Sequence, residues 1–102
     1  MTTRAKITFG KVSYHGNIWE FEETFLVNYD GYPENIIPII KSGNLDKYER
    51  LENFNEFGAV DFIYYIDDGN PNKVRCTVLE FDWDFYNHFG VDNYKIVKEL
   101  IL

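Results

Sequence analysis

"NYDGYPENII", residues 28–37, decides the fold, because it marks where an extended segment ends and a helix begins. Its centre combines an acid that can hydrogen-bond to its own backbone, a flexible residue, an aromatic ring and a residue of fixed φ, which is typical of a tight turn. These four residues are Asp30, Gly31, Tyr32 and Pro33. The sequence leaves open whether this corner only turns the chain or also binds a ligand.

Upstream of the corner, residues 5–14 and 17–29 alternate apolar and polar side chains, as β-strands do. A glycine-containing turn separates them, and the alternation slips by one residue at Gly10, which indicates a β-bulge. We therefore predict a long antiparallel hairpin. Because the two ends of a hairpin meet, we expect Arg4 and Asp30 to form an ion pair that fixes the corner.

Downstream of the corner, apolar spacing and turn residues predict further elements in the order helix, helix, strand and strand. They span residues 36–41, 45–53, 59–67 and 73–83. The last segment has a capping residue, Asp92 or Asn93, followed by an apolar stripe at helical spacing, so we expect a third helix. The stripe consists of Ile96, Val97, Leu100 and Ile101.

These elements predict a single α+β domain over residues 1–102. We expect a mainly antiparallel four-stranded sheet made of two β-hairpins, with two or three short helices on one face. One version of this fold uses a ββα unit twice.

The composition limits the function classes. The chain has 102 residues, of which 45% are hydrophobic and 19% aromatic, so it can bury a core and is not disordered. Its formal net charge is −7, which repels nucleic acid phosphates and disfavours direct nucleic acid binding. The charge favours a partner protein with a basic surface; the alternative is ordinary solubility charge.

The single cysteine, Cys76, cannot form an intramolecular disulfide, and its apolar strand favours a buried spectator over a nucleophile. The sequence begins directly with a strand pattern, so we expect no signal peptide. No apolar run is long enough to predict a membrane span. We therefore expect a cytoplasmic protein, in the host cell if the chain is viral.

The frame "TTRAKI … NYDGYPENIIPII … GAVDFIYYIDDG" resembles small uncharacterised proteins of phages and bacteria. Those proteins open with an Arg-Ala-x-Ile strand and carry Asp-Gly-Tyr-Pro before a short helix, and the resemblance covers roughly two-thirds of this chain. They often have a histidine before the aspartate, where Asn28 and Tyr29 stand here, so no role of that histidine is carried over. The resemblance implies no activity, but it suggests a phage or mobile-element setting in which small acidic proteins bind host proteins.

The stretch "EFDWDF", residues 80–85, places carboxylates at every second position of a predicted strand, about 7 Å apart. This spacing suits mimicry of phosphates or a hard cation such as Mg²⁺; the alternative is a solvated strand face. Further acids and a tyrosine in the preceding hairpin extend the predicted partner surface. The residues of this surface are Tyr65, Asp67, Asp68, Glu80, Asp82 and Asp84.

No catalytic motif is present. The two histidines, His15 and His88, have no metal-ligand spacing around them, and there is neither a glycine-rich phosphate loop nor a nucleophile elbow. We therefore predict no catalytic residue, no metal and no cofactor, and favour a non-enzymatic protein.

Three hypotheses follow for the function. The first is an interaction protein that binds a host protein through its acidic, tyrosine-rich surface and inhibits a defence or nucleic-acid-handling factor. The second is a small-ligand or nucleotide-binding protein in which Arg4 neutralises an anion, Asp30 accepts a hydrogen bond and Tyr32 stacks on a base. The third is a homodimer formed through an edge strand or the C-terminal segment.

Overall fold

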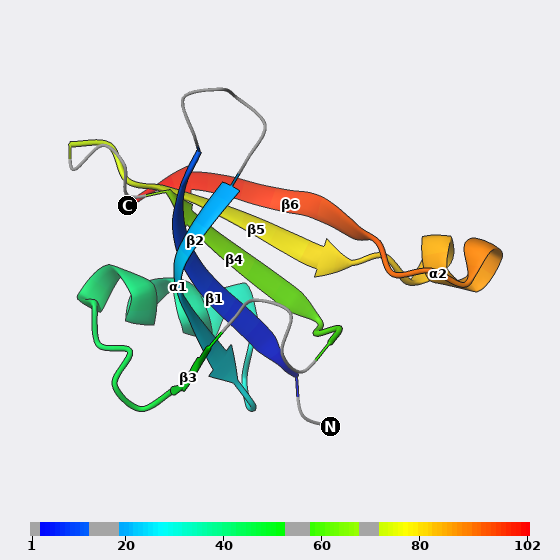
Figure 1. Cartoon of the computed structure of the whole chain (residues 1–102), viewed down its shortest axis with the longest axis horizontal. Helices are drawn as coiled ribbons and strands as arrows, with labels where there is room; N and C mark the ends of the chain where they lie inside the picture. The colour runs from blue at the N-terminus through cyan, green and yellow to red at the C-terminus, as the bar shows by residue number, and fades with distance from the viewer. Residues whose placement is uncertain (1–2, 13–18, 53–57, 68–71) are drawn as a thin grey trace.

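The computed structural model of the chain describes residues 3–12, 19–52, 58–67 and 72–102. These residues form a six-stranded mixed sheet with the strand order β3-β2-β1-β4-β5-β6, together with two helices (Figure 1). In chain order the elements are β1 (Ala5–Val12), β2 (Trp19–Val27), α1 (Pro33–Ser42), β3 (Glu49–Leu51), β4 (Phe62–Asp67), β5 (Arg75–Phe81), α2 (Trp83–Phe89) and β6 (Tyr94–Ile101). None of the helices among these residues is long and apolar enough to cross a membrane.

The predicted N-terminal hairpin is confirmed. β1 and β2 pair antiparallel, with Ala5 opposite Val27, and the register shifts between Phe9 and Gly10. The shift confirms the bulge that the slipped alternation indicated at Gly10. Pairing of the hairpin's ends brings the start of the chain beside the corner that follows β2.

The prediction of a four-stranded, mainly antiparallel sheet is wrong. β1 lies between β2 and β4, and its pairing with β4 is parallel, with Ala5 opposite Phe62. A parallel neighbour needs a crossover connection, which here runs through α1 and β3. The sheet is therefore one mixed surface, and the chain does not repeat a ββα unit.

Two predicted helices are strands. Residues 49–51, inside the helix expected over residues 45–53, form β3, which pairs with the end of β2. The C-terminal helix is also wrong, because residues 94–101 form β6 along the outer edge of β5. The spacing of its apolar residues fits a helix, but the β-branched side chains of Ile96, Val97 and Ile101 favour a strand once a partner strand is available.

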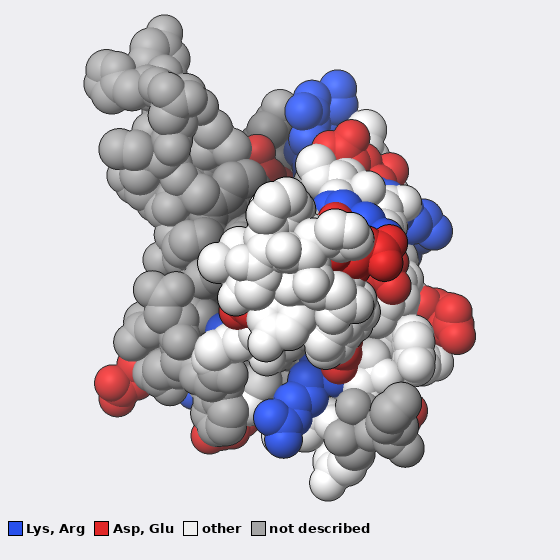
Figure 2. Space-filling view, turned by 90° about the vertical axis from the view of Figure 1, so that its right-hand side faces the viewer, with Lys and Arg blue, Asp and Glu red and all other residues white. Residues whose placement is uncertain are grey.

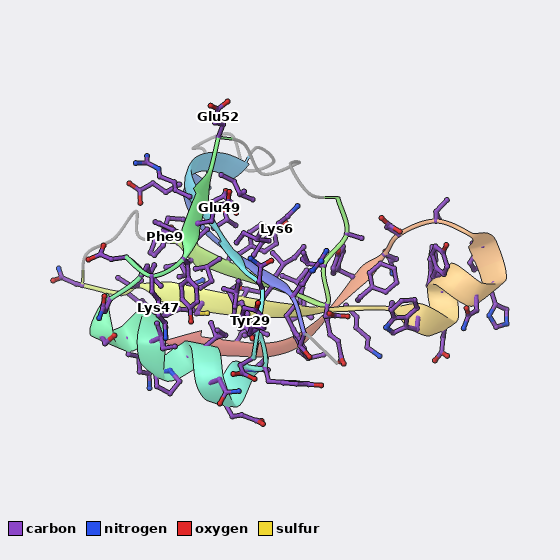
Figure 3. The ribbon with its side chains drawn as sticks, turned by 90° about the horizontal axis from the view of Figure 1, so that it is seen from below. Lys6, Phe9, Tyr29, Lys47, Glu49 and Glu52 are labelled. Carbon is purple, nitrogen blue, oxygen red and sulfur yellow. The ribbon has the colours of Figure 1, made fainter. Side chains whose placement is uncertain are left out.

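Helix α1 covers one face of the sheet, and the larger core lies between them (Figure 3). Pro33 occupies its first turn, where no backbone hydrogen bond is lost, and Gly43 ends it in the left-handed conformation. The side chains buried between α1 and the sheet are Ala5, Ile7, Val27, Ile36, Ile37, Ile40, Leu45, Phe62, Tyr64, Ile66, Cys76 and Val78.

The sheet face opposite α1 holds a smaller core that includes polar groups. Lys6 is buried there, and its ammonium donates to the carbonyl of Gly58 at 2.8 Å. The hydroxyls of Thr8 and Thr24 lie 3.0 Å apart across the hairpin. Buried polar groups are tolerated when they are hydrogen-bonded. Hydrogen bonds between side chains and backbone therefore contribute to the packing of this face, in addition to apolar contacts.

The corner is pinned to the sheet at Gly31. The amide of Gly31 donates to the carbonyl of Thr3 at 3.1 Å, and the carbonyl of Gly31 accepts from the buried hydroxyl of Tyr64 in β4. A Cβ on Gly31 would lie 2.9 Å from the Thr3 oxygen, so only glycine fits this approach. Contacts with Thr3 and with β4 thus fix the position of the corner that follows β2.

Because Cys76 is buried, the free energy of unfolding changes with pH in the alkaline range. Burial raises the pKa of the Cys76 thiol from 9.0 to about 11, while Lys98 lowers it by a smaller amount. Burial also raises the pKa of Tyr64, so both groups favour their neutral form in the folded state. For Cys76, the contribution to the free energy of unfolding is fully present below pH 9 and is lost as the pH rises through 11. It amounts to about 3 kcal/mol, since a tenfold change in the ionisation constant corresponds to roughly 1.4 kcal/mol.

We therefore expect the free energy of unfolding, measured by urea titration, to fall steadily between pH 8 and pH 11. The Cys76→Ala variant is expected to show a flatter profile between pH 9 and pH 10, because the thiol no longer titrates in its unfolded state. Identical slopes for the two proteins in that interval would contradict the assignment.

Candidate functional site

The exposed apolar side chains are concentrated in one part of the sequence. Among the described residues, nine large hydrophobic side chains are exposed, and seven of them lie between residues 83 and 101. The seven are Trp83, Tyr86, Phe89, Val91, Ile96, Val97 and Ile101. Scattered exposed hydrophobics are ordinary on a protein surface, but a contiguous group marks an interaction site.

Helix α2 provides the first part of this surface. The carboxylate of Asp82 caps it by accepting from the amide of Phe85 at 3.1 Å, and Gly90 ends it in the left-handed conformation. No residue of α2 is buried, and the helix extends beyond the end of the sheet (Figure 1). A seven-residue helix is marginal by itself in water. Contacts outside the helix are therefore needed to stabilise it.

Aromatic contacts attach α2 to the sheet. The buried ring of Phe81, the last residue of β5, lies 4.6 Å from the ring of Trp83, 5.8 Å from that of Tyr86 and 5.4 Å from that of Tyr94, centroid to centroid. The hydroxyl of Tyr94 exchanges two hydrogen bonds with the backbone of Val60, each 3.0 Å long. The base of α2 is thus held in place while the outer rings remain accessible.

Strand β6 continues the surface. It is an edge strand of eight residues, paired on one side with β5, and most of its side chains are exposed. An edge strand presents backbone donors and acceptors on its other side, and a long apolar one favours pairing with another chain. We call Trp83–Phe89 together with Val91 and β6 the aromatic arm.

The aromatic arm begins in an acidic part of the chain. Residues 80–92 contain four acids and neither lysine nor arginine, whereas β6 contains Lys95, Lys98 and Glu99. Figure 2 looks at the molecule from the side on which α2 lies in Figure 1, and shows an uncharged surface with both acidic and basic atoms at its margin. The result is an apolar centre with charged groups of both signs around it, the acids coming from residues 80–92.

The predicted acidic strand face is not formed as expected. Glu80 lies in β5, but Asp82 is the cap of α2 and Asp84 lies in the first helical turn, so the three carboxylates do not share one face of a strand. The Asp82 cap and the Gly90 stop are signals that the sequence does contain, and they were missed because alternation in "EFDWDF" was extended past Phe81.

The other predicted partner residues are divided between locations. Tyr65 is half-buried in the core opposite α1, and Asp67 ends β4 on the same strand. Asp68 lies outside the described residues. Tyr32 is half exposed, and its ring packs 5.7 Å from that of Phe62. Tyr32 and Glu80 line one hollow with Trp83 of α2, whereas Tyr65 lies in the smaller core.

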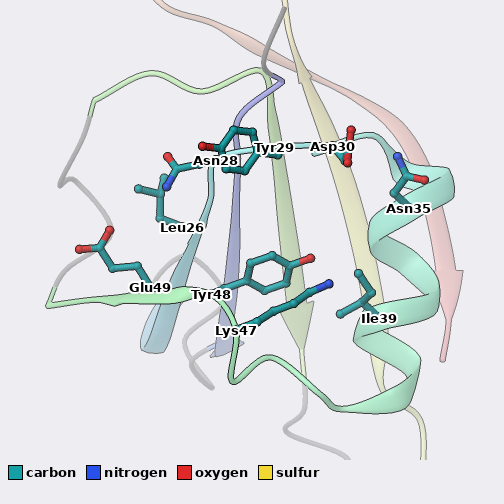
Figure 4. Close-up of a pocket in the computed structure, with 9 residues that line it drawn as sticks. All are labelled: Leu26, Asn28, Tyr29, Asp30, Asn35, Ile39, Lys47, Tyr48 and Glu49. Atoms are coloured by element: carbon teal, nitrogen blue, oxygen red, sulfur yellow. The ribbon is translucent and has the colours of Figure 1, made fainter.

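A second candidate site is a cleft of about 510 Å³ beside the Asp30 corner (Figure 4). The end of β2, the corner, α1 and the segment before β3 enclose it. Its lining residues are Leu26, Asn28, Tyr29, Asp30, Asn35, Ile39, Lys47, Tyr48 and Glu49. Its volume lies within the range of small-molecule sites, about 300–1,000 Å³.

The cleft includes only part of the predicted ligand corner. Asp30 lines it, but Arg4 and Tyr32 do not. In the described part of the chain no ion pair joins Arg4 to Asp30; instead the amide of Arg4 donates to the carboxylate of Asp61 at 3.0 Å. The ion pair suggested by the sequence is therefore not formed, and it is the backbone of Arg4 that joins the start of β1 to the approach to β4.

Comparisons with protein-family models, curated proteins and solved structures found no match. Across residues 3–12, 19–52, 58–67 and 72–102, no group of three or more His, Cys, Asp or Glu side chains is gathered closely enough to hold a metal ion. The arrangement of the aromatic arm and of the cleft is thus the basis on which a function can be proposed.

Proposed function

We propose that the protein acts by binding another protein through the aromatic arm. The observation that carries the proposal is the placement of seven of the nine exposed large hydrophobic side chains in residues 83–101. Tryptophan and tyrosine dominate the energetics of protein interfaces, and here both project from a helix that the sheet leaves uncovered.

The partner class follows from charge. The acids around α2 would face the partner, and the chain as a whole carries −7, so the complementary surface is an apolar groove with a basic rim. Such a groove is typical of proteins that handle nucleic acids, where acidic side chains would take the place of phosphates. Inhibition of a host defence or nucleic-acid-handling factor of this kind is the function that suits the surface best.

A second copy of the chain is the less favourable occupant. Pairing two copies through the arm would bring together two segments with four acids each and two chains of net charge −7. Like charges placed opposite one another at an interface are unfavourable. A mass by light scattering that doubles with concentration would contradict the proposal of a basic partner.

The test compares a partner's affinity for matched aromatic variants. After capture from host lysate identifies a candidate, its dissociation constant is measured for the wild type, for Trp83→Ala/Phe89→Ala and for Tyr29→Ala. Tyr29 is the control, because it is 70% exposed but lies outside the arm. We expect the double variant to bind at least tenfold more weakly, Tyr29→Ala to bind as the wild type does, and affinity to fall with salt.

The opposite result is equally clear. If the double variant keeps its thermal stability and binds the partner as tightly as the wild type, the arm is not the interface. If Tyr29→Ala weakened the partner's binding as much as the double variant does, the aromatic arm would likewise not be the specific interface. Affinity that does not change between low and high salt would reject the basic rim.

A further inference from the structure

The cleft beside Asp30 is lined by two carboxylates, those of Asp30 and Glu49, and by the ammonium of Lys47, which lies across the cleft from Asp30. In Figure 4, Tyr29 and Asp30 lie along one side, Lys47 and Tyr48 lie along the other, and Asn35 and Ile39 of α1 close the end. The ammonium of Lys47 lies 5.3 Å from the centre of the Tyr48 ring, which positions the cation along its side of the cleft.

The carboxylate side is preorganised by the backbone. Asp30 has a φ of 53°, the one non-glycine residue with positive φ in the described part of the chain. Aspartate tolerates this left-handed conformation at a modest cost. The neighbouring Gly31 is held on both sides, through its amide by Thr3 and through its carbonyl by Tyr64. A strained residue persists only where its surroundings fix it, and such residues concentrate at binding sites.

Neither charge is neutralised by an ion pair in the part of the chain that the structure describes. Among the described residues, no carboxylate lies within ion-pair distance of Lys47 and no cation lies within that distance of Asp30. A ligand that supplies the two opposite charges would therefore gain both interactions without breaking an ion pair. Apolar contact is available between them, because the buried Leu26 and half-buried Ile39 also line the cleft.

We infer that this cleft binds a small zwitterion, a molecule with an ammonium group, a carboxylate and a short apolar body, such as a free amino acid. The ammonium would lie against Asp30, the carboxylate against Lys47, and the apolar body over Ile39. The carboxamide of Asn35 can hydrogen-bond to either end. The inference is independent of the protein-binding proposal, because the labelled cleft residues lie away from α2 (Figure 3).

The affinity is expected to be modest. Ion pairs at exposed positions contribute little each, and Asp30 and Lys47 are both exposed. Specificity should therefore come from the requirement for both charges rather than from either one. This requirement can be tested with ligands that differ in one charge only.

The experiment is a titration of ¹⁵N-labelled protein with three probes, followed by NMR: L-leucine, N-acetyl-L-leucine, which lacks the ammonium, and L-leucinamide, which lacks the carboxylate. With L-leucine we expect saturating shifts at the amides of residues 30, 35 and 47–49. Either modified probe should bind at least fivefold more weakly. No saturation with L-leucine, or equal binding of all three probes, would overturn the inference.

Two variants assign the charges to the two ends of the ligand. Asp30→Asn keeps the side chain's shape and tolerates the left-handed backbone, and should remove the preference for L-leucine over N-acetyl-L-leucine. Lys47→Gln should instead remove the preference for L-leucine over L-leucinamide. If both variants keep both preferences, the two charges do not contact the ligand.

Discussion

Replacing Ile7 by alanine is expected to lower the free energy of unfolding by about 2–5 kcal/mol. Ile7 is fully buried in β1, at the centre of the sheet, and packs in the core beneath α1. The substitution removes buried methyl and methylene groups and leaves a cavity that rigid neighbours on two strands cannot fill. Urea denaturation monitored by circular dichroism measures the loss directly.

Ile96→Ala is the matched control, because the same atoms are removed from an exposed site. Ile96 is 61% exposed on β6, so the expected loss is below about 1 kcal/mol, within the range of strand preference. A loss at Ile96 as large as that at Ile7 would contradict the placement of this side chain on an open surface. The pair therefore tests the position of the C-terminal segment, which periodicity alone assigned to a helix.

The parts of the fold that depend on local pattern were predictable. Alternation identified the β1–β2 hairpin, and a one-residue slip located its bulge at Gly10. Proline at position 33 and glycine at position 43 mark the ends of α1, although the predicted helix was too short at both ends. Each of these signals depends on neighbours within a few residues.

The parts that depend on distant pairing were not predictable. Nothing near β1 in the sequence shows that β4, more than fifty residues away, pairs with it in parallel. For residues 94–101 the apolar spacing fits both a helix and a strand, and the available edge of β5 decides between them. Tertiary context overrides local preference in such segments.

The candidate sites show the same division. The turn residues around Asp30 suggested a corner with a ligand role, and the structure places a cleft there. The aromatic arm was hidden, because a sequence rich in aromatics does not show which rings are buried. Phe81 is buried whereas Trp83 is exposed, and only the end of β5 between them separates their environments.

Replacing Gly31 by alanine is expected to cost about 2–3 kcal/mol, as overpacking does in a rigid site. The new Cβ would meet the Thr3 carbonyl oxygen at 2.9 Å and the Ala5 Cβ at 3.0 Å. The Thr3 oxygen is a backbone atom and the Ala5 Cβ is bonded directly to the backbone, so neither can rotate away. Thermal or urea unfolding gives the loss, and the amide shifts of Asp30 and Asn35 report the displaced cleft.

Gly43 provides the control, because it has a different reason for being glycine. It has a φ of 74°, and none of the described atoms lies within 4 Å of the position that a Cβ would take, so alanine there meets only left-handed strain, about 1 kcal/mol. Asparagine tolerates that conformation, and Gly43→Asn should recover most of the loss. Gly31→Asn should not, since its larger side chain still meets the Thr3 carbonyl. A smaller loss at Gly31 than at Gly43 would show that the corner yields, and it would remove the preorganisation on which the zwitterion site depends.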